Sequence, residues 1–153
     1  MPTQPPQIIN MGCRLNMRDG DVIREAITKA RDAVAEGLIV LNSCAVTGEA
    51  VRQSRQRVRR LHRDRPDAQI VVTGCAAQID PDQFRDLPGV ARVLGNEEKF
   101  APESYQGLGA TDDEDMLGLK VRVSDIMSVR EHAGHLARGY SERTRAFVEV
   151  QTG

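Results

Sequence analysis

The chain has 153 residues, with 21 lysines and arginines against 22 aspartates and glutamates, so its formal net charge is −1. Hydrophobic residues make up 40% of it and aromatic residues 3%, which excludes a disordered chain and leaves Val, Ile, Leu and Ala to fill a core. No apolar stretch approaches the roughly 20 residues of a membrane helix, and residues 1–6 lack the features of a secretory signal. We therefore expect a cytoplasmic globular domain with no membrane or secreted partner.

Short apolar runs alternate with segments of helical periodicity along the first hundred residues. The pattern predicts strands at 7–11, 38–41, 68–73 and 90–94, and helices at 19–36, 48–64 and 81–87. Further along the chain, residues 119–123 have the composition of one more strand at or near the sheet edge, and residues 146–150 alternate apolar and polar residues. Alternating strands and helices predict an α/β fold, with an open, mostly parallel sheet and helices on both faces.

Three cysteines stand at an interval of 31 residues, and each directly follows a predicted strand: Cys13, Cys44 and Cys75. An odd number leaves one thiol over in any disulfide scheme, and a chain without a secretory signal keeps its thiols reduced. Crossover connections place the C-terminal ends of the strands at one edge of the sheet, where open α/β folds bind ligands. We expect the three cysteines to converge there as thiols or metal ligands, although each alone is also typical of a buried core residue.

Three converging thiolates favour one kind of metal site over another. Structural zinc usually takes four ligands, often in paired C-x-x-C motifs, and these are absent; we interpret His132 and His135 as surface residues. Iron–sulfur clusters are held by thiolates, normally four, so three cysteines leave one iron open to an exogenous ligand. Gly12 and Gly74 lack a Cβ, which lets the backbone approach a bulky inorganic core.

The residues around the cysteines carry a family resemblance. Residues 12–16 (GCRLN), 42–47 (NSCAVT) and 73–78 (TGCAAQ) resemble the N-terminal domain of the radical S-adenosylmethionine methylthiotransferases. Residues 93–99 (VLGNEEK) resemble most the branch that acts on N6-threonylcarbamoyladenosine beside the tRNA anticodon. Sister branches act on isopentenyladenosine in tRNA or on an aspartate of a ribosomal protein. Ser43 replaces the family's usual Thr, and Gly20 stands where Ser or Thr is usual, which we expect to loosen the first turn of the helix at 19–36.

The resemblance implies a cofactor and a substrate. It implies that Cys13, Cys44 and Cys75 ligate an auxiliary 4Fe–4S cluster, with tRNA as the partner of the full-length enzyme. A second 4Fe–4S cluster and S-adenosylmethionine would belong to a following barrel domain, whose C-x-x-x-C-x-x-C motif is expected just beyond Gly153. We therefore expect this chain to be a fragment that contains no catalytic residues of its own and is inactive alone.

The expected organisation follows from these segments. We expect a disordered N-terminus at 1–6, the cluster-binding domain at 7–101, a solvated linker at 102–118, an edge strand and connector at 119–142, and the first strand of the radical domain at 143–153.

Two further groups of polar residues are candidate site residues. Gly12, Asn16, Asn42, Gly74 and Gln78 lie near the cysteines, and we interpret the amides as ordering the loops, with hydrogen bonds to cluster sulfurs as the alternative. The predicted helix at 48–64 is rich in arginine, and the candidate contacts to the tRNA backbone are Arg52, Arg55, Arg59 and Arg63. A solvated face whose arginine stems cover apolar surface is the competing interpretation.

Two other classes of function remain open at this point. One is a non-catalytic iron–sulfur or RNA-binding module that acts beside other proteins. The other is a thiol enzyme in which one cysteine of lowered pKa at a helix N-terminus does the chemistry. Substitution of single cysteines separates the cluster hypothesis from the thiol enzyme, because only a shared centre needs all three.

Overall fold

The computed structural model describes residues 5–12, 14–30, 37–108 and 120–124, and in it five parallel strands form one sheet in the order of the chain. The strands are β1 (Gln7–Asn10), β2 (Ile39–Ser43), β3 (Ile70–Gly74), β4 (Val90–Leu94) and β5 (Val121–Arg122). The helices are α1 (Arg14–Lys29), α2 (Gly48–Asp64), α3 (Cys75–Ile79) and α4 (Asp82–Arg85), with 3-10 helices η2 (Glu98–Phe100) and η3 (Pro102–Tyr105). The predicted parallel α/β architecture is confirmed.

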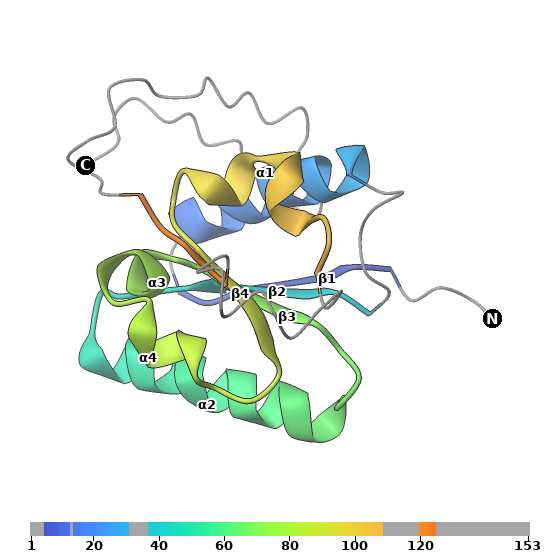
Figure 1. Ribbon diagram of the computed structural model, residues 1–153. Coiled ribbons are helices and arrows are strands. Elements are labelled where there is room, and N and C mark those ends of the chain that lie inside the picture. The colour runs from blue at the N-terminus through green and yellow to red at the C-terminus, as the bar shows by residue number, and fades with distance from the viewer. Residues whose placement is uncertain (1–4, 13, 31–36, 109–119, 125–153) are drawn as a thin grey trace.

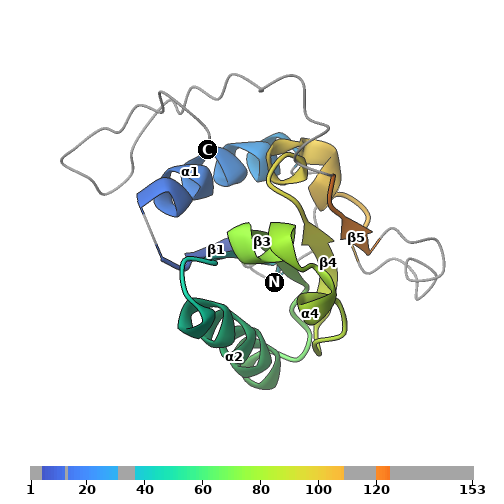
Figure 2. The same ribbon diagram turned by 90° about the vertical axis from the view of Figure 1, so that its left-hand side faces the viewer.

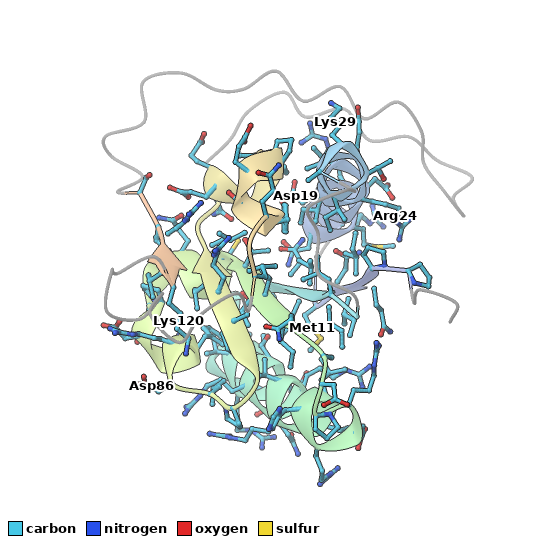
Figure 3. All side chains as sticks on the ribbon, turned by 45° about the vertical axis from the view of Figure 1, so that its right-hand side comes forward. Met11, Asp19, Arg24, Lys29, Asp86 and Lys120 are labelled. Atoms are coloured by element: carbon cyan, nitrogen blue, oxygen red, sulfur yellow. The ribbon has the colours of Figure 1, made fainter. Side chains whose placement is uncertain are left out.

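The sheet is the middle of three layers. Helix α1 and the segment that contains η2 and η3 cover one face, and α2 and α4 cover the other (Figures 1 and 2). Successive strand residues point to opposite faces, so Ile39 and Leu41 pack into the core beneath α2 while Val40 packs into the core beneath α1. Side chains fill both layers (Figure 3). Helices cover both faces of the sheet, so the edge formed by the C-terminal ends of the strands is left for the connecting loops.

A β-bulge turns one charged residue of β4 into the interior. The register between β3 and β4 shifts, so that Ile70 lies opposite Val90 but Val71 lies opposite Arg92. The Arg92 side chain is 1% exposed and donates hydrogen bonds to the carbonyl oxygens of Ser104 (2.8 Å) and Gln106 (3.1 Å). These bonds fix η3 against the sheet.

The segment after β4 differs from the sequence prediction. The predicted linker at 102–118 begins with η3, whose Tyr105 is fully buried, and Leu108 packs into the same core as α1. The described part of that linker, residues 102–108, is therefore packed rather than solvated. Sequence composition missed this because Tyr105 stands in a segment of mixed polarity, and the contacts that Arg92 of β4 makes with this segment leave no local pattern in the sequence.

Helix α1 begins earlier than predicted. The sequence predicted a helix over 19–36, whereas α1 starts at Arg14, the residue that follows Cys13 in the sequence. Its inward side there presents polar residues, Asn16 and Arg18, which are both buried, so hydrophobic periodicity appears only from Val22 onward. Gly20 consequently lies in the second turn of α1 and not in the first, which corrects the expected loosening of the first turn.

The other elements follow the prediction to different degrees. Helix α2 and strand β4 have the predicted bounds, and β5 forms within the predicted strand at 119–123 and pairs with β4. Helix α3, which begins at Cys75, was not predicted, because five residues with two alanines carry no measurable periodicity. Predictions for residues 1–4, 31–36, 109–119 and 125–153, including His132, His135 and the strand at 146–150, lie outside the described residues. Among the described helices, none has the length and apolar character needed to cross a membrane.

Candidate metal centre

Two of the three predicted ligands leave adjacent strands at matched positions. Ser43 at the end of β2 is paired with Gly74 at the end of β3, and Cys44 and Cys75 are the next residues of the two strands. Cys44 is buried, with 5% of its surface exposed, whereas Cys75 is exposed at the start of α3, and neither forms a disulfide. Cys13 lies outside the described residues.

The glycines beside the cysteines stand where a side chain has no room. Gly12 has a φ of 104°, and a Cβ on it would lie 2.7 Å from the Sγ of Cys44. Gly74 has a φ of 97°, and a Cβ there would lie 2.6 Å from the backbone nitrogen of Ser43. Both φ values fall in the region that glycine occupies without strain. Within the described residues, each glycine therefore allows two neighbouring segments of the chain to approach closely. At Gly12 these segments are the residues after β1 and Cys44.

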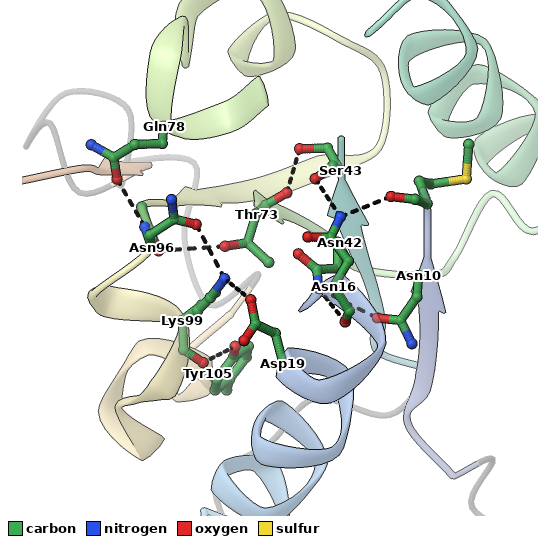
Figure 4. Close-up of polar contacts among 12 residues, drawn as sticks. Asn10, Asn16, Asp19, Asn42, Ser43, Thr73, Gln78, Asn96, Lys99 and Tyr105 are labelled. Carbon is green, nitrogen blue, oxygen red and sulfur yellow. Dashed lines mark hydrogen bonds and ion pairs between the residues drawn. The ribbon is translucent and has the colours of Figure 1, made fainter. Parts of the chain in front are cut away.

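Asparagine side chains tie the start of α1 to the ends of the first two strands (Figure 4). The Asn16 amide donates to the carbonyl oxygens of Met11 (2.8 Å) and Ser43 (2.9 Å). The Asn42 amide donates to the carbonyl oxygen of Asn16 (2.9 Å) and to the Asn10 side chain (3.3 Å). Asn16 and Asn42 are 2% and 0% exposed, and their amides hydrogen-bond to backbone oxygens, as buried polar groups do. These contacts support the interpretation that the amides order the loops, and hydrogen bonds to cluster sulfurs stay the alternative.

A second set of contacts joins β2, β3 and α3. The Ser43 hydroxyl donates to the carbonyl oxygen of Thr73 (2.5 Å) and accepts from the backbone nitrogen of Ala77 (3.3 Å). The Thr73 hydroxyl donates to the carbonyl oxygen of Gly95 (3.4 Å), just beyond β4. Ser43 replaces the family's usual Thr, but both residues carry a hydroxyl, so the hydrogen bond to the carbonyl oxygen of Thr73 is kept.

Gln78 links α3 to the ends of the last two strands. Its side-chain oxygen accepts from the backbone nitrogen of Asn96 (2.8 Å), and its amide nitrogen donates to the carbonyl oxygen of Ser124 (2.8 Å). Glu98 binds the same end of β5 by accepting from the backbone nitrogen of Ser124 (2.8 Å). The loops after β3, β4 and β5 are thus held together by side-chain hydrogen bonds.

A buried ion pair completes the polar contacts at this edge. The Lys99 Nζ lies 2.6 Å from the Oδ2 of Asp19 on α1, and it also donates to the Asn96 side chain (3.1 Å). The Tyr105 hydroxyl donates to the Lys99 carbonyl oxygen; burial raises the pKa of Tyr105, so the phenol stays protonated. None of Asp19, Asn96 and Lys99 was predicted as a site residue, although residues 93–99 carried part of the family resemblance.

Exposed apolar side chains cluster in sequence around the cysteines. Among the described residues, the large hydrophobic side chains that are exposed are Met17 (41%), Val46 (78%) and Ile79 (75%). Val46 follows Cys44 by two residues, and Ile79 ends the helix that Cys75 begins. Single exposed apolar residues are ordinary on a protein surface, and these three lie within four residues of a cysteine in the sequence.

The arginine-rich helix α2 lies on the face of the sheet opposite α1 (Figure 1). Arg52, Arg59 and Arg63 are exposed and Arg55 is half-buried, while Ser54, Val58 and Leu61 are buried against the sheet. Hydrogen bonds from Arg52 (2.7 Å) and Gln53 (3.0 Å) lower the pKa of Glu49 to about 2. Arg52 is therefore engaged within the helix.

The described residues supply sulfur ligands but do not by themselves complete a metal site. Among them, which leave out Cys13, no group of three or more His, Cys, Asp or Glu side chains lies close enough to hold a metal ion. The two described thiols leave neighbouring strand ends, and the nearby carboxylate of Asp19 is occupied by Lys99. Thiolate sulfur is the ligand of iron–sulfur clusters. The donor set at this edge fits such a cluster if a third thiol joins it.

The fold and this edge define a parallel α/β domain in which Cys44 and Cys75 directly follow the C-terminal ends of β2 and β3. A family model described as "Uncharacterized protein family UPF0004" matches residues 6–95, and the chain belongs to this family. The chain is 38% identical over 147 residues to "Threonylcarbamoyladenosine tRNA methylthiotransferase MtaB" of Rickettsia prowazekii, covering 96% of this chain and 32% of that protein.

Two further relatives have related names. The chain is 32% identical to the protein of the same name from Bacillus subtilis, covering 94% of this chain and 32% of that relative. It is 28% identical to "tRNA-2-methylthio-N(6)-dimethylallyladenosine synthase" of Roseobacter denitrificans, covering 93% of this chain and 33% of that protein. The chain thus spans about a third of the length of these curated relatives, and the family resemblance of its cysteine segments is confirmed.

Proposed function

We propose that this chain is the part of a tRNA methylthiotransferase that binds an auxiliary 4Fe–4S cluster through Cys13, Cys44 and Cys75. The observation that carries the proposal is the register of the sheet: Ser43 pairs with Gly74, so Cys44 and Cys75 leave neighbouring strands at the same level. The β1 loop reaches the same place, because a Cβ on Gly12 would lie 2.7 Å from the Cys44 Sγ. Cys13 is the next residue in the sequence after Gly12.

The names of the relatives support the substrate. The Rickettsia and Bacillus proteins are named for threonylcarbamoyladenosine in tRNA, and the Roseobacter protein, at lower identity, for a dimethylallyladenosine product. We propose the threonylcarbamoyladenosine branch for this chain, with the isopentenyladenosine and ribosomal-protein branches as alternatives. A second 4Fe–4S cluster and S-adenosylmethionine are then bound by further parts of the full-length enzyme, and the 153 residues alone are inactive.

The residues of this chain hold and orient the ligands rather than carry out bond chemistry. When bound, the cluster supplies an iron position open to an exogenous sulfur ligand. Asn16 and Asn42 fix the turn into α1 against β2, and Ser43 fixes β2 against β3 and α3, so that the loops bearing Cys44 and Cys75 keep their spacing.

The arginine stripe of α2 is proposed as a contact for the tRNA backbone. Arg52, Arg55, Arg59 and Arg63 follow one another at helical spacing on the side of α2 away from the sheet. Such a contact is electrostatic and independent of sequence. Because Arg52 is engaged by Glu49 (2.7 Å), the larger share of the interaction falls to the other members of the stripe.

Iron and sulfide content after anaerobic reconstitution tests the proposal. We expect about four iron and about four sulfide per chain, with brown absorbance. Each of Cys13→Ser, Cys44→Ser and Cys75→Ser should lower the iron content and alter the same absorbance, because the three thiolates share one centre.

A matched control adds a thiol elsewhere: Thr28→Cys, on the exposed side of α1, should leave iron and sulfide unchanged. A colourless protein in which all three native thiols react freely with an alkylating reagent would contradict the proposal. Dependence on one cysteine, with the other two dispensable, would instead indicate a thiol enzyme.

A further inference from the structure

Hydrogen bonds at the C-terminal edge of the sheet form a closed circuit that starts and ends on α1 (Figure 4). Asn16 on α1 binds the carbonyl oxygen of Ser43, and Ser43 binds that of Thr73. Thr73 reaches the carbonyl oxygen of Gly95, next to Asn96. Lys99 then joins Asn96 to Asp19, which lies on α1 three residues after Asn16. We call this circuit the polar ring, formed by Asn16, Asp19, Ser43, Thr73, Asn96 and Lys99.

Lys99 is the member of the polar ring that joins the segments farthest apart in sequence. It is 3% exposed, and its partner Asp19 lies 80 residues earlier in the chain. The ammonium group has three donors: one binds Asp19 (2.6 Å), one binds Asn96 (3.1 Å), and the group also lies 5.0 Å from the centroid of the Phe100 ring. A buried lysine with its donors used in this way has one well-defined position.

The energetics of a buried ion pair indicate what this interaction does. Desolvation of both charges offsets much of their attraction, so the pair is weak evidence for stability, whereas removal of one partner leaves an uncompensated buried charge. A pair of this kind has its clearest use in specifying one arrangement over others. Here the Asp19–Lys99 pair specifies how closely α1 lies to the segment after β4.

We propose that Lys99 and Asp19 are positioning residues that close the polar ring and hold the cysteine-bearing loops in one arrangement. Asp19 and Asn16 lie on the same side of α1, at a spacing of three residues. Asn16 binds the carbonyl oxygen of Ser43, and Cys44 is the next residue. If α1 shifts when Lys99 is removed, Asn16 moves with it and displaces Ser43, and the position of Cys44 then changes. The role of the ring in holding a cluster rests on the proposed function; its role in holding Cys44 does not.

The alkylation rate of Cys44 in the 153-residue chain without iron tests the ring directly, with the site identified by mass spectrometry. Cys44 is buried, so it reacts through local opening. We expect Lys99→Met and Asp19→Asn each to raise its rate about tenfold or more, and Lys99→Arg to restore most of the protection. The matched control is Lys29→Met, because Lys29 forms an exposed ion pair with Glu25 on the same helix (3.2 Å) and should leave the rate unchanged.

Two additions separate positioning from general destabilisation. Val58 is a buried residue of α2 and is not a member of the polar ring, so Val58→Ala lowers stability without removing any of the ring's hydrogen bonds. For the same loss of melting temperature, Val58→Ala should raise Cys44 reactivity much less than Lys99→Met. In the reconstituted chain, Lys99→Met should broaden or shift the electron paramagnetic resonance signal of the reduced cluster, and Val58→Ala should not.

The outcomes distinguish the two proposals. Cys44 protection equal to that of the unmodified chain in both Lys99→Met and Asp19→Asn would overturn the positioning role. Equal reactivity of Lys99→Met and the Val58→Ala control would also overturn it. If the unmodified chain binds no iron, the proposed cluster function fails, while the alkylation rates still decide whether the ring holds Cys44.

Discussion

Two glycines at the cysteine-bearing edge occupy positions that other residues enter only with strain. Gly74 combines a φ of 97° with crowding by Ser43 and Asn42, and Gly12 combines a φ of 104° with crowding by Cys44. The sequence identified both glycines from their place before a cysteine. Within the described residues, an added Cβ on either glycine would meet Ser43, Asn42 or Cys44, and the approach of these glycines to an inorganic core stays a prediction.

A set of three alanine substitutions separates the two costs at Gly74. Gly107 has a φ of 66° but open space around it, and Gly48 has neither a positive φ nor a neighbour within 4 Å of an added Cβ. Positive φ alone costs about 1–3 kcal/mol. We expect urea melts to show that loss for Gly107→Ala, a larger loss for Gly74→Ala, and no loss for Gly48→Ala. Equal stability of the Gly74 and Gly107 variants would show that the crowding is relieved at no cost.

Gly20 shows why the sequence explained one residue incorrectly. Sequence reasoning treated it as a helix-loosening departure from the family pattern. A Cβ on Gly20 would lie 2.5 Å from the Nδ2 of Asn10, so the glycine lets α1 approach β1 closely. This role depends on the packing of α1 against β1, which no local pattern reveals.

At the level of elements, the bounds of α2 were predictable, whereas the helix of α1 was predicted but its start was not. Helix α2 has a Thr47 side chain that caps the nitrogen of Ala50 (3.1 Å) and one apolar stripe, both of which are visible in the sequence. The first turns of α1 face the polar ring, so their buried side chains are Asn16 and Arg18 and carry no apolar period. Short elements such as α3 escape prediction because a period needs more residues to be recognised.

If the arginine stripe of α2 contacts the tRNA backbone, its removal should lower the affinity for tRNA. Replacement of Arg52, Arg55, Arg59 and Arg63 with glutamine should weaken binding of the full-length protein to a tRNA transcript. The slope of log affinity against log salt should fall by about one for each phosphate that α2 no longer neutralises. Arg52→Gln alone should have the smallest effect, because Arg52 is engaged by Glu49.

The control for this prediction lies on the other face of the sheet. Arg24→Gln with Lys29→Gln removes two exposed cations from α1, which packs against the opposite face of the sheet (Figure 3). That double variant should retain both affinity and salt slope. The control removes two positive charges and the stripe variant removes four. An equal loss of affinity per charge removed in the two variants would mean that binding responds to net charge and not to the α2 stripe.

For the whole molecule, the period of 31 residues between cysteines reflects the parallel sheet. Each period carries the chain through one crossover, from one strand end to the next, and the register pairs Ser43 with Gly74, the residues before Cys44 and Cys75. The parallel topology was therefore predictable from the spacing, and the convergence of all three cysteines stays a prediction. The polar ring was not predictable, because Asp19 and Lys99 meet only after α1 and the loop beyond β4 have packed on the same face.

X-ray diffraction from the anaerobically reconstituted chain, with anomalous scattering recorded at the iron edge, gives the most direct test. We predict one compact group of iron peaks, bonded to the sulfur atoms of Cys13, Cys44 and Cys75, with one iron that has no protein ligand. Iron bound at a different place, or density that leaves any of the three sulfur atoms out of the cluster, would contradict the account.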